Sequence, residues 1–146
     1  MIAIINGPNL NLLGRRQPEV YGNVTFESYL RTLREKFPET PVEYFQSNCE
    51  GDIITHIHKL GYETPECNGI VINPGAYTHY SYAIADAISS IGLPVVEVHI
   101  SNIMGREHFR NKSVTAPGCK GMLTGFGLDG YEMAISFLIN RAIDKT

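Results

Sequence analysis

Glu97 and His99 have residue types and a spacing that suit proton transfer. They lie in a run rich in Val and Ile at positions 95–100, which predicts a strand, so their side chains share one face. A carboxylate beside an imidazole fixes its tautomer and favours its protonated form, as a general acid requires. The same spacing also suits a buried structural ion pair, and the two residues alone do not decide between these interpretations.

The segment Arg15-Arg16-Gln17-Pro18-Glu19-Val20-Tyr21-Gly22 holds a second set of reactive groups. The pKa of a free tyrosine is about 10, so Tyr21 is a poor base unless a cation stabilises its phenolate. An arginine earlier on the same folded loop supplies such a cation. Tyrosine is also a common packing residue, so its type alone leaves Tyr21 as either a base or a core residue.

Short apolar runs alternate with segments of helical periodicity along the chain. The runs are rich in Ile and Val, which predicts strands buried on both faces, at residues 2–5, 42–45, 70–72, 95–100 and 122–123. Apolar residues recur at helical spacing at positions 26–37, 53–60, 83–91 and 131–142. Thr25 is the expected N-cap of the first helix. Ser47-Asn48-Cys49-Glu50 is the expected capping box of the second, with Gly61 as its end.

This alternation predicts a flavodoxin-like α/β fold with three layers. Its five-stranded parallel sheet is expected in the order 2-1-3-4-5, with right-handed crossovers and helices on both faces. The 146 residues show no linker, repeat or low-complexity segment and are expected to form a single domain over residues 1–146. Ligands of such folds bind beyond the carboxyl ends of the strands, so the residues after each strand are the candidates for a site.

Polar side chains follow four of the expected strands. The segments are Asn6-Gly7-Pro8-Asn9, Gln46-Ser47-Asn48, Asn73-Pro74-Gly75 and His99-Ile100-Ser101-Asn102. Together with Arg15, Arg16 and His79, they predict a binding edge for a small, oxygen-rich, anionic molecule. Turn-forming preference alone accounts for the glycines and prolines, but not for the arginines and histidines.

Composition narrows the classes of function. Hydrophobic residues make up 43% and charged residues 18%, as in a chain that buries a core. The net charge of −3 argues against nucleic-acid binding, and the short apolar runs argue against a membrane span. The N-terminal run turns polar at Asn6, which favours a strand over a signal peptide. The chain has an odd number of cysteines, namely Cys49, Cys67 and Cys119. They are expected to be free thiols in a reducing, cytoplasmic environment.

Several familiar motifs are present only in part. The glycines at 125, 127 and 130 match a dinucleotide fingerprint, but the 16 residues that follow are too few to hold the acidic residue expected about 20 positions later. His56 and His58 are two residues apart, so on a helix they face nearly opposite ways and are expected to be solvated rather than metal ligands. The lysines are not placed for a Schiff base at the binding edge. No cofactor and no metal are expected.

Five segments in a fixed order carry a family resemblance. They are Asn6-Gly7-Pro8-Asn9-Leu10-Asn11-Leu12-Leu13-Gly14, residues 16–22, Gln46-Ser47-Asn48 with Glu50-Gly51, residues 72–79, and Val95-Val96-Glu97-Val98-His99-Ile100-Ser101-Asn102. Weaker matches lie at Arg106-Glu107, Phe109-Arg110 and residues 125–131. In these segments the chain resembles the type II 3-dehydroquinate dehydratases over nearly its whole length.

The resemblance implies an anti elimination of water from 3-dehydroquinate to 3-dehydroshikimate through an enolate, in aromatic biosynthesis or quinate catabolism. By position, Tyr21 is the base, Arg16 stabilises its phenolate, and His99 protonates the departing hydroxyl. Glu97 orients His99, and Asn9 helps to hold a water at the enolate oxygen. The implied substrate-binding residues are Asn73, His79, Ile100, Ser101 and Arg110.

The resemblance also implies self-association as a homododecamer, a tetramer of trimers, in which Asp86 reaches the site of a neighbouring subunit. Asp86 lies off the apolar stripe at 83–91, so it is expected to point away from its own core. Tyr80, Tyr82 and Met104-Gly105 depart from the family pattern and leave the local packing and the interface open.

Two alternatives remain at this point. A flavodoxin-like FMN-binding electron carrier would need a Ser- and Thr-rich phosphate loop after the first strand, where this chain has Asn, Leu and Arg residues. A catalytically inactive protein of the same fold would not need all the proposed catalytic residues, which are present.

Overall fold

The computed structural model describes residues 1–16, 18–21 and 23–143, without the side chains of Val20 and Tyr21. Its five strands form one parallel sheet in the order β2-β1-β3-β4-β5, as predicted. The strands are β1 (Ile2–Asn6), β2 (Val42–Gln46), β3 (Gly69–Asn73), β4 (Val95–His99) and β5 (Gly121–Thr124). Most extend past the predicted apolar runs, because residues such as Asn6 and Asn73 also pair across the sheet.

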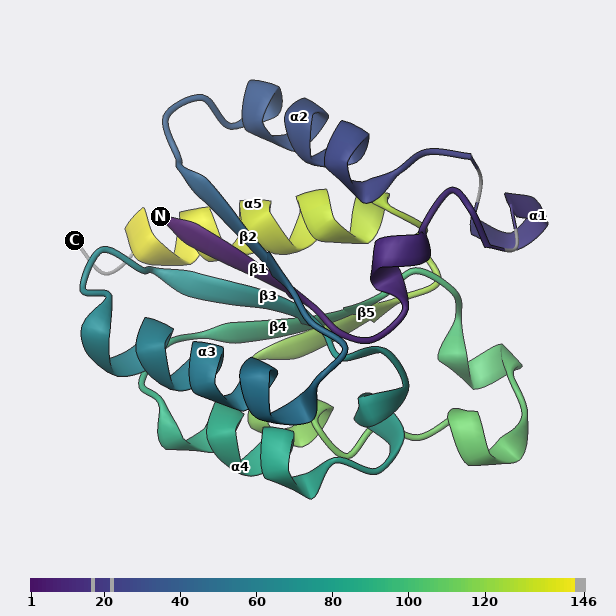
Figure 1. Cartoon of the computed structure of the whole chain (residues 1–146). Helices are drawn as coiled ribbons and strands as arrows, with labels where there is room; N and C mark the ends of the chain where they lie inside the picture. Colours follow the sequence, from purple (N-terminus) through teal and green to yellow (C-terminus); the bar gives the residue numbers. More distant parts are fainter. Residues whose placement is uncertain (17, 22, 144–146) are drawn as a thin grey trace.

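Helices cover both faces of this sheet and give the predicted three layers (Figure 1). The layer on one face consists of α2 (Phe26–Lys36) and α5 (Asp129–Ile143), and the other of α3 (Glu50–Glu63) and α4 (Tyr82–Ser90). A short helix, α1 (Pro18–Tyr21), lies away from both layers. Within the described residues, none of the helices is long and apolar enough to cross a lipid bilayer.

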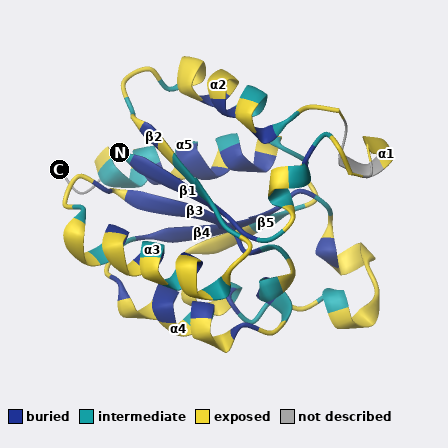
Figure 2. Cartoon of the chain, in the orientation of Figure 1, coloured by how far each residue is buried: buried dark blue, intermediate teal, exposed yellow. Residues whose placement is uncertain are grey.

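Alternate residues of the central strands point into two separate cores. In β1, Ile2 and Ile4 pack with α2 and α5, whereas Ala3 and Ile5 pack with α3 and α4. Every residue of β1, β3 and β4 is buried, but the edge strands β2 and β5 are partly exposed (Figure 2). Burial on both faces therefore explains the continuous apolar pattern of the central strands.

The predicted start of α2 is confirmed, but that of α3 is wrong in detail. Thr25 caps α2, since its hydroxyl accepts a hydrogen bond from the N–H of Ser28. At α3 the N-cap is Cys49, whose side chain makes no capping bond. The Ser47 hydroxyl instead accepts from the Cys49 N–H and donates to Asp52, so it orders the approach to the helix rather than its first turn.

The predicted end of α3 at Gly61 is also wrong, because the helix continues to Glu63. Gly61 serves packing instead. A Cβ at this position would lie 2.2 Å from Cγ2 of Ile91, which follows α4. The glycine thus lets the C-terminal ends of α3 and α4 approach closely.

The carboxyl ends of the strands meet at one edge, where short 3₁₀ helices form the connections (Figure 1). Asn6 at the end of β1 lies between Gln46 of β2 and Asn73 of β3. The next residue, Gly7, passes so close to the chain after β3 that a Cβ would lie 2.4 Å from the Pro74 carbonyl oxygen. The 3₁₀ helices at this edge are η1 (Leu10–Leu12), η2 (Gly75–His79), η3 (Ile103–Gly105) and η4 (His108–Arg110), and a further one, η5 (Ala116–Gly118), precedes the start of β5.

Candidate active site

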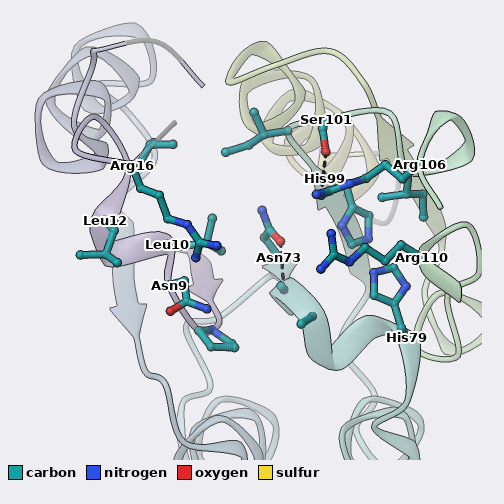
Figure 3. A pocket seen from close by; sticks show the side chains of 16 residues that line it. Asn9, Leu10, Leu12, Arg16, Asn73, His79, His99, Ser101, Arg106 and Arg110 are labelled. Atoms are coloured by element: carbon teal, nitrogen blue, oxygen red, sulfur yellow. Dashed lines mark hydrogen bonds between the residues drawn. The ribbon is translucent and has the colours of Figure 1, made fainter. Parts of the chain in front are cut away.

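A pocket of about 240 Å³ opens at this edge, between the loops that follow β1, β3 and β4 (Figure 3). Its lining is mixed: aliphatic side chains such as Leu12 and Ile103 alternate with amides, imidazoles and guanidinium groups. Eight of the predicted site residues line it: Asn9, Arg16, Asn73, His79, His99, Ile100, Ser101 and Arg110. The loops that surround a parallel sheet edge therefore bring together residues that are distant in sequence.

The predicted pairing of Glu97 with His99 is present at the base of the pocket. Nε2 of His99 lies 2.9 Å from Oε2 of Glu97, and Glu97 is fully buried while His99 is 6% exposed. A carboxylate accepts hydrogen bonds, so Nε2 is the donor in this pair. The other ring nitrogen, Nδ1, is then the one available to a molecule in the pocket, which His99 lines and Glu97 does not.

Three hydroxyl groups that sequence reasoning missed surround the Glu97 carboxylate. Ser113 donates to Oε2 at 2.7 Å, Thr78 lies 3.1 Å from the same oxygen, and Thr115 donates to Oε1. The three residues are 16 to 19 positions away from Glu97 in sequence and follow no motif. Only the folded chain shows that they share one partner.

These donors determine the charge state of Glu97. Burial raises the pKa of its carboxyl, but hydrogen bonds from His99, Thr115 and Ser113, with the charge of His99, outweigh burial and hold the pKa below its ordinary value. Cys119 lies near this charge. Burial and the Glu97 charge raise the pKa of the Cys119 thiol to about 12, so the thiol stays neutral. The pair at the base of the pocket is therefore an ionised carboxylate beside an imidazole.

Positive charge enters the pocket from two sides. Arg16 extends from the loop after β1, and Arg106 and Arg110 extend from the loop after β4 (Figure 3). Arg106 was not among the predicted site residues, and its Nη1 lies 3.4 Å from the Ser101 hydroxyl. Arg15 does not line the pocket. Three guanidinium groups around a small cavity fit an anionic, oxygen-rich ligand.

Asn73 is held by the buried core. Its Oδ1 accepts from the N–H of Gly75 at 3.1 Å, and its Nδ2 donates to the Tyr131 hydroxyl at 3.0 Å. Tyr131 in turn donates to Oδ1 of Asn6 at 2.8 Å. Burial raises the pKa of Tyr131, so this phenol is neutral and keeps its proton for Asn6. One N–H of the Asn73 amide remains for a ligand, because Nδ2 carries two.

The loop after β2 supports the pocket rather than lining it. Asn48 accepts from the N–H of Asn9 at 3.1 Å and from Nε2 of Gln46 at 3.1 Å. Asn9 has a left-handed backbone with φ of 69°, a conformation that asparagine tolerates better than most residues. This backbone bond fixes the Asn9 conformation, and the Asn9 side chain points into the pocket (Figure 3).

His79 has a defined tautomer in the same way as His99. Its Nδ1 lies 2.7 Å from the Lys112 carbonyl oxygen, which only accepts, so Nδ1 is the donor. Nε2 of His79 is then the nitrogen available to the pocket. Lys112 belongs to the same loop as Ser113, so this loop positions both the imidazole of His79 and the carboxylate of Glu97.

Asp86 is a predicted site residue that does not line this pocket. Asp86 lies on the exposed face of α4, as its position off the apolar stripe predicts, and does not line the pocket of its own chain. Tyr82, one helical turn away, is 69% exposed. The backbone of Tyr21 ends α1, but its side chain lies outside the described residues.

The glycine-rich turn before α5 has a structural role. The N–H groups of Gly125 and Gly127 donate to the carbonyl oxygens of His99 and Ile100, at 3.2 and 3.0 Å. Both glycines have positive φ, which the turn requires. These donors hold the end of β4, so they are engaged with the protein itself, in agreement with the expectation of a turn rather than a dinucleotide site.

The expectation of two solvated histidines on α3 is wrong for His56. Its ring stacks on Phe45 with a centroid distance of 4.1 Å, and burial lowers its pKa. His58 is exposed. In residues 1–16, 18–21 and 23–143, no three His, Cys, Asp or Glu side chains are grouped so that they could hold a metal ion. The three cysteines have free thiols, as expected.

Comparison with known proteins assigns the chain to a family. Residues 1–139 match the family model described as dehydroquinase class II. The chain belongs to the class II dehydroquinase family. It is 53% identical over 136 residues to the 3-dehydroquinate dehydratase of Caldicellulosiruptor bescii, which covers 92% of each chain. It is also 53% identical to that of Clostridium perfringens, over 96% of this chain and 97% of the relative.

Solved structures of class II dehydroquinases share the fold. The type II dehydroquinase of Butyrivibrio crossotus superposes with a TM-score of 0.87 at 49% identity, covering 94% of this chain and 95% of the other. That of Propionibacterium acnes gives a TM-score of 0.88 at 42% identity, covering 94% of each chain. These similarities agree with the resemblance seen in the sequence and give no support to an FMN-binding electron carrier.

The charge state of Glu97 predicts how the stability of this dehydroquinase depends on pH. The folded pKa of Glu97 lies below its ordinary value of 4.5, so between the two values the folded protein binds fewer protons than the unfolded chain. The stability that this carboxylate contributes is therefore fully present above pH 4.5 and is lost as pH falls through the folded pKa. Glu97→Gln should flatten the rise of unfolding free energy with pH over this acidic range, measured by urea denaturation.

The control is Glu35→Gln, which removes an exposed carboxylate of α2. It should leave the pH dependence of the wild type unchanged. If the unfolding free energies of Glu97→Gln and the wild type changed with pH in parallel, this would contradict the ionised state of the buried carboxylate.

Proposed function

We propose that the protein removes water from 3-dehydroquinate to give 3-dehydroshikimate, in aromatic biosynthesis or quinate catabolism. The observation that carries the proposal is the buried Glu97–His99 pair at the base of a pocket bordered by three arginines. Such a site offers a proton donor beside a binding surface for a hydroxylated carboxylate. The names and identities of the family relatives point to the same substrate.

The first step of the proposed reaction is removal of the proton next to the ketone. Tyr21 as a phenolate takes this proton, and the C–H electrons move into the ketone to form an enolate. Arg16, which lines the pocket, stabilises the phenolate and the developing negative charge. Asn9 points into the same space and holds a water at the enolate oxygen.

The second step is loss of the hydroxyl group. The enolate electrons form the carbon–carbon double bond, the C–O bond breaks on the opposite face, and His99 protonates the departing oxygen from Nδ1. Water leaves, and the product is a conjugated enone. Tyr21 is then protonated and His99 neutral, so one proton must pass from the base side to the acid side through solvent before the next turnover.

Substrate binding relies on the polar lining of the pocket. Asn73, His79 and Ser101 offer donors and acceptors to the hydroxyl groups, and Ile100 and Ser101 line the end of β4. Arg110 and Arg106 supply positive charge for the carboxylate from the loop after β4. In this proposal no metal or cofactor takes part, since a phenolate and an imidazolium supply both proton transfers.

We also propose a cytoplasmic homododecamer, built as a tetramer of trimers. Asp86 supports this assembly, because it lies on an exposed helix face and does not line its own pocket. The exposed rings of Tyr80 and Tyr82, near the start of α4, offer apolar area for a neighbouring subunit. Analytical ultracentrifugation measures the oligomeric state directly, and a fully active monomer would contradict the proposed assembly.

The proposed reaction can be followed by the ultraviolet absorbance of the conjugated enone. The wild type should convert 3-dehydroquinate without added metal. His99→Ala should lower kcat by about a hundredfold or more, as expected for loss of a general acid, with a smaller effect on KM. His58 is exposed and does not line the pocket, so His58→Ala is the matched control and should have a near-normal kcat. A wild type that does not dehydrate 3-dehydroquinate, or a His99→Ala variant with normal kcat, would contradict the proposal.

The two neighbouring arginines provide a second test with an internal control. Arg16 lines the pocket and Arg15 does not, although both are exposed. Arg16→Ala should therefore cut kcat strongly, and Arg16→Lys should rescue it only in part, because an ammonium lacks the planar guanidinium. Arg15→Ala should lower kcat much less. Steady-state kinetics of the three variants would contradict the assignment if Arg15→Ala were the crippled one.

A further inference from the structure

We infer that Thr78, Ser113 and Thr115 are positioning residues of the reaction, acting on His99 through the Glu97 carboxylate. The inference rests on the proposed function, since it concerns how the general acid is held. None of the three hydroxyls lines the pocket, so none touches substrate. All three lie against one fully buried carboxylate, whose other partner is the imidazole.

The two carboxylate oxygens are held differently. Oε2 accepts hydrogen bonds from Nε2 of His99 at 2.9 Å, from the Ser113 hydroxyl at 2.7 Å and from the Thr78 hydroxyl at 3.1 Å. Oε1 accepts a hydrogen bond from the Thr115 hydroxyl, which is its one donor among the described residues. Because Thr115 binds one oxygen and Ser113 the other, the carboxylate cannot rotate without losing a hydrogen bond. Its Oε2 therefore stays directed at Nε2 of His99.

The donors are neutral hydroxyls, which matters for the chemistry. Each hydroxyl carries a single proton of very low acidity, so it stabilises the carboxylate without competing for the proton that His99 transfers. A lysine or arginine at the same place would repel the imidazolium. Cys119 also lies near Glu97, and its raised pKa keeps this thiol neutral. The imidazole of His99 is thus the partner through which the carboxylate acts on the pocket.

Backbone hydrogen bonds hold the Ser113 hydroxyl and join the two segments that carry the three hydroxyls. The hydroxyl of Ser113 accepts from the N–H of Ala116 at 2.9 Å, which leaves its proton for Glu97. The N–H of Val114 donates to the Thr78 carbonyl oxygen at 2.7 Å, so the segment from 113 to 116 is joined to η2. The network therefore connects the loop carrying His79 and the loop after η4 to the strand that carries His99.

A double-mutant cycle tests whether the hydroxyls act through Glu97. Thr115→Val is nearly isosteric and removes the donor to Oε1 without opening a cavity. In the wild-type background it should lower kcat about tenfold with KM nearly unchanged, since a hydrogen bond to a charged group is lost away from the substrate. In the Glu97→Gln background the same substitution should change kcat less than about twofold, because the negative charge that the Thr115 hydroxyl stabilises is already gone.

Two further variants keep the cycle interpretable. Thr115→Ser retains the hydroxyl and should restore most of the lost kcat. Thr64→Val removes a threonine hydroxyl that bonds to the Lys59 carbonyl at the C-terminal end of α3, and it should leave kcat unchanged in both backgrounds. If Thr78→Val is as well folded as Thr115→Val, it provides a second cycle with the same expectation.

The outcomes separate this inference from the proposed function. An active wild type in which Thr115→Val loses the same factor in both backgrounds would overturn the inference, as would a lower melting temperature with unchanged kcat. Absence of dehydration by the wild type would instead contradict the proposed function itself. Loss of kcat in the wild-type background alone, rescued by Thr115→Ser, is the result that the geometry predicts.

Discussion

The burial of the Glu97 carboxylate is the constraint on which the site depends. A charge removed from water is costly unless hydrogen bonds and an opposite charge replace the lost hydration. Four donors from β4, η2 and the loop after η4 do this. Meeting that requirement aligns three segments of the chain, and the alignment fixes which nitrogen of His99 faces the pocket.

The surrounding fold supplies rigidity where the chemistry needs it. Gly125 and Gly127 hold the end of β4 through its carbonyl oxygens, and Tyr131 anchors Asn73 from within the core. Gly7 allows the loops after β1 and β3 to pass within van der Waals distance of each other. The proposed acid side of the site is therefore built on strands and a packed core, and the proposed base side on the loop after β1. This division suits a reaction whose two proton transfers occur on opposite faces of the substrate.

Much of this arrangement could be predicted from the sequence. The strand order followed from the alternation of buried runs and helical stripes, and the residues after each strand gave most of the pocket because parallel strands end at one edge. Thr78, Ser113 and Thr115 could not be found in this way, since hydroxyl residues in loops have many roles and their common partner appears only after folding. His56 and Gly61 were misjudged for a related reason: their roles come from contacts with Phe45 and Ile91 on other elements.

The central claim is that enolate formation and protonation of the leaving hydroxyl are carried out by different groups. Incubation of His99→Ala with 3-dehydroquinate in heavy water tests it directly, with NMR of the remaining substrate as the readout. If the base acts independently, the hydrogen next to the ketone should be replaced by deuterium while dehydration is slowed about a hundredfold or more. Loss of exchange and dehydration to the same extent would contradict the account, because it would show that His99 is also needed to form the enolate.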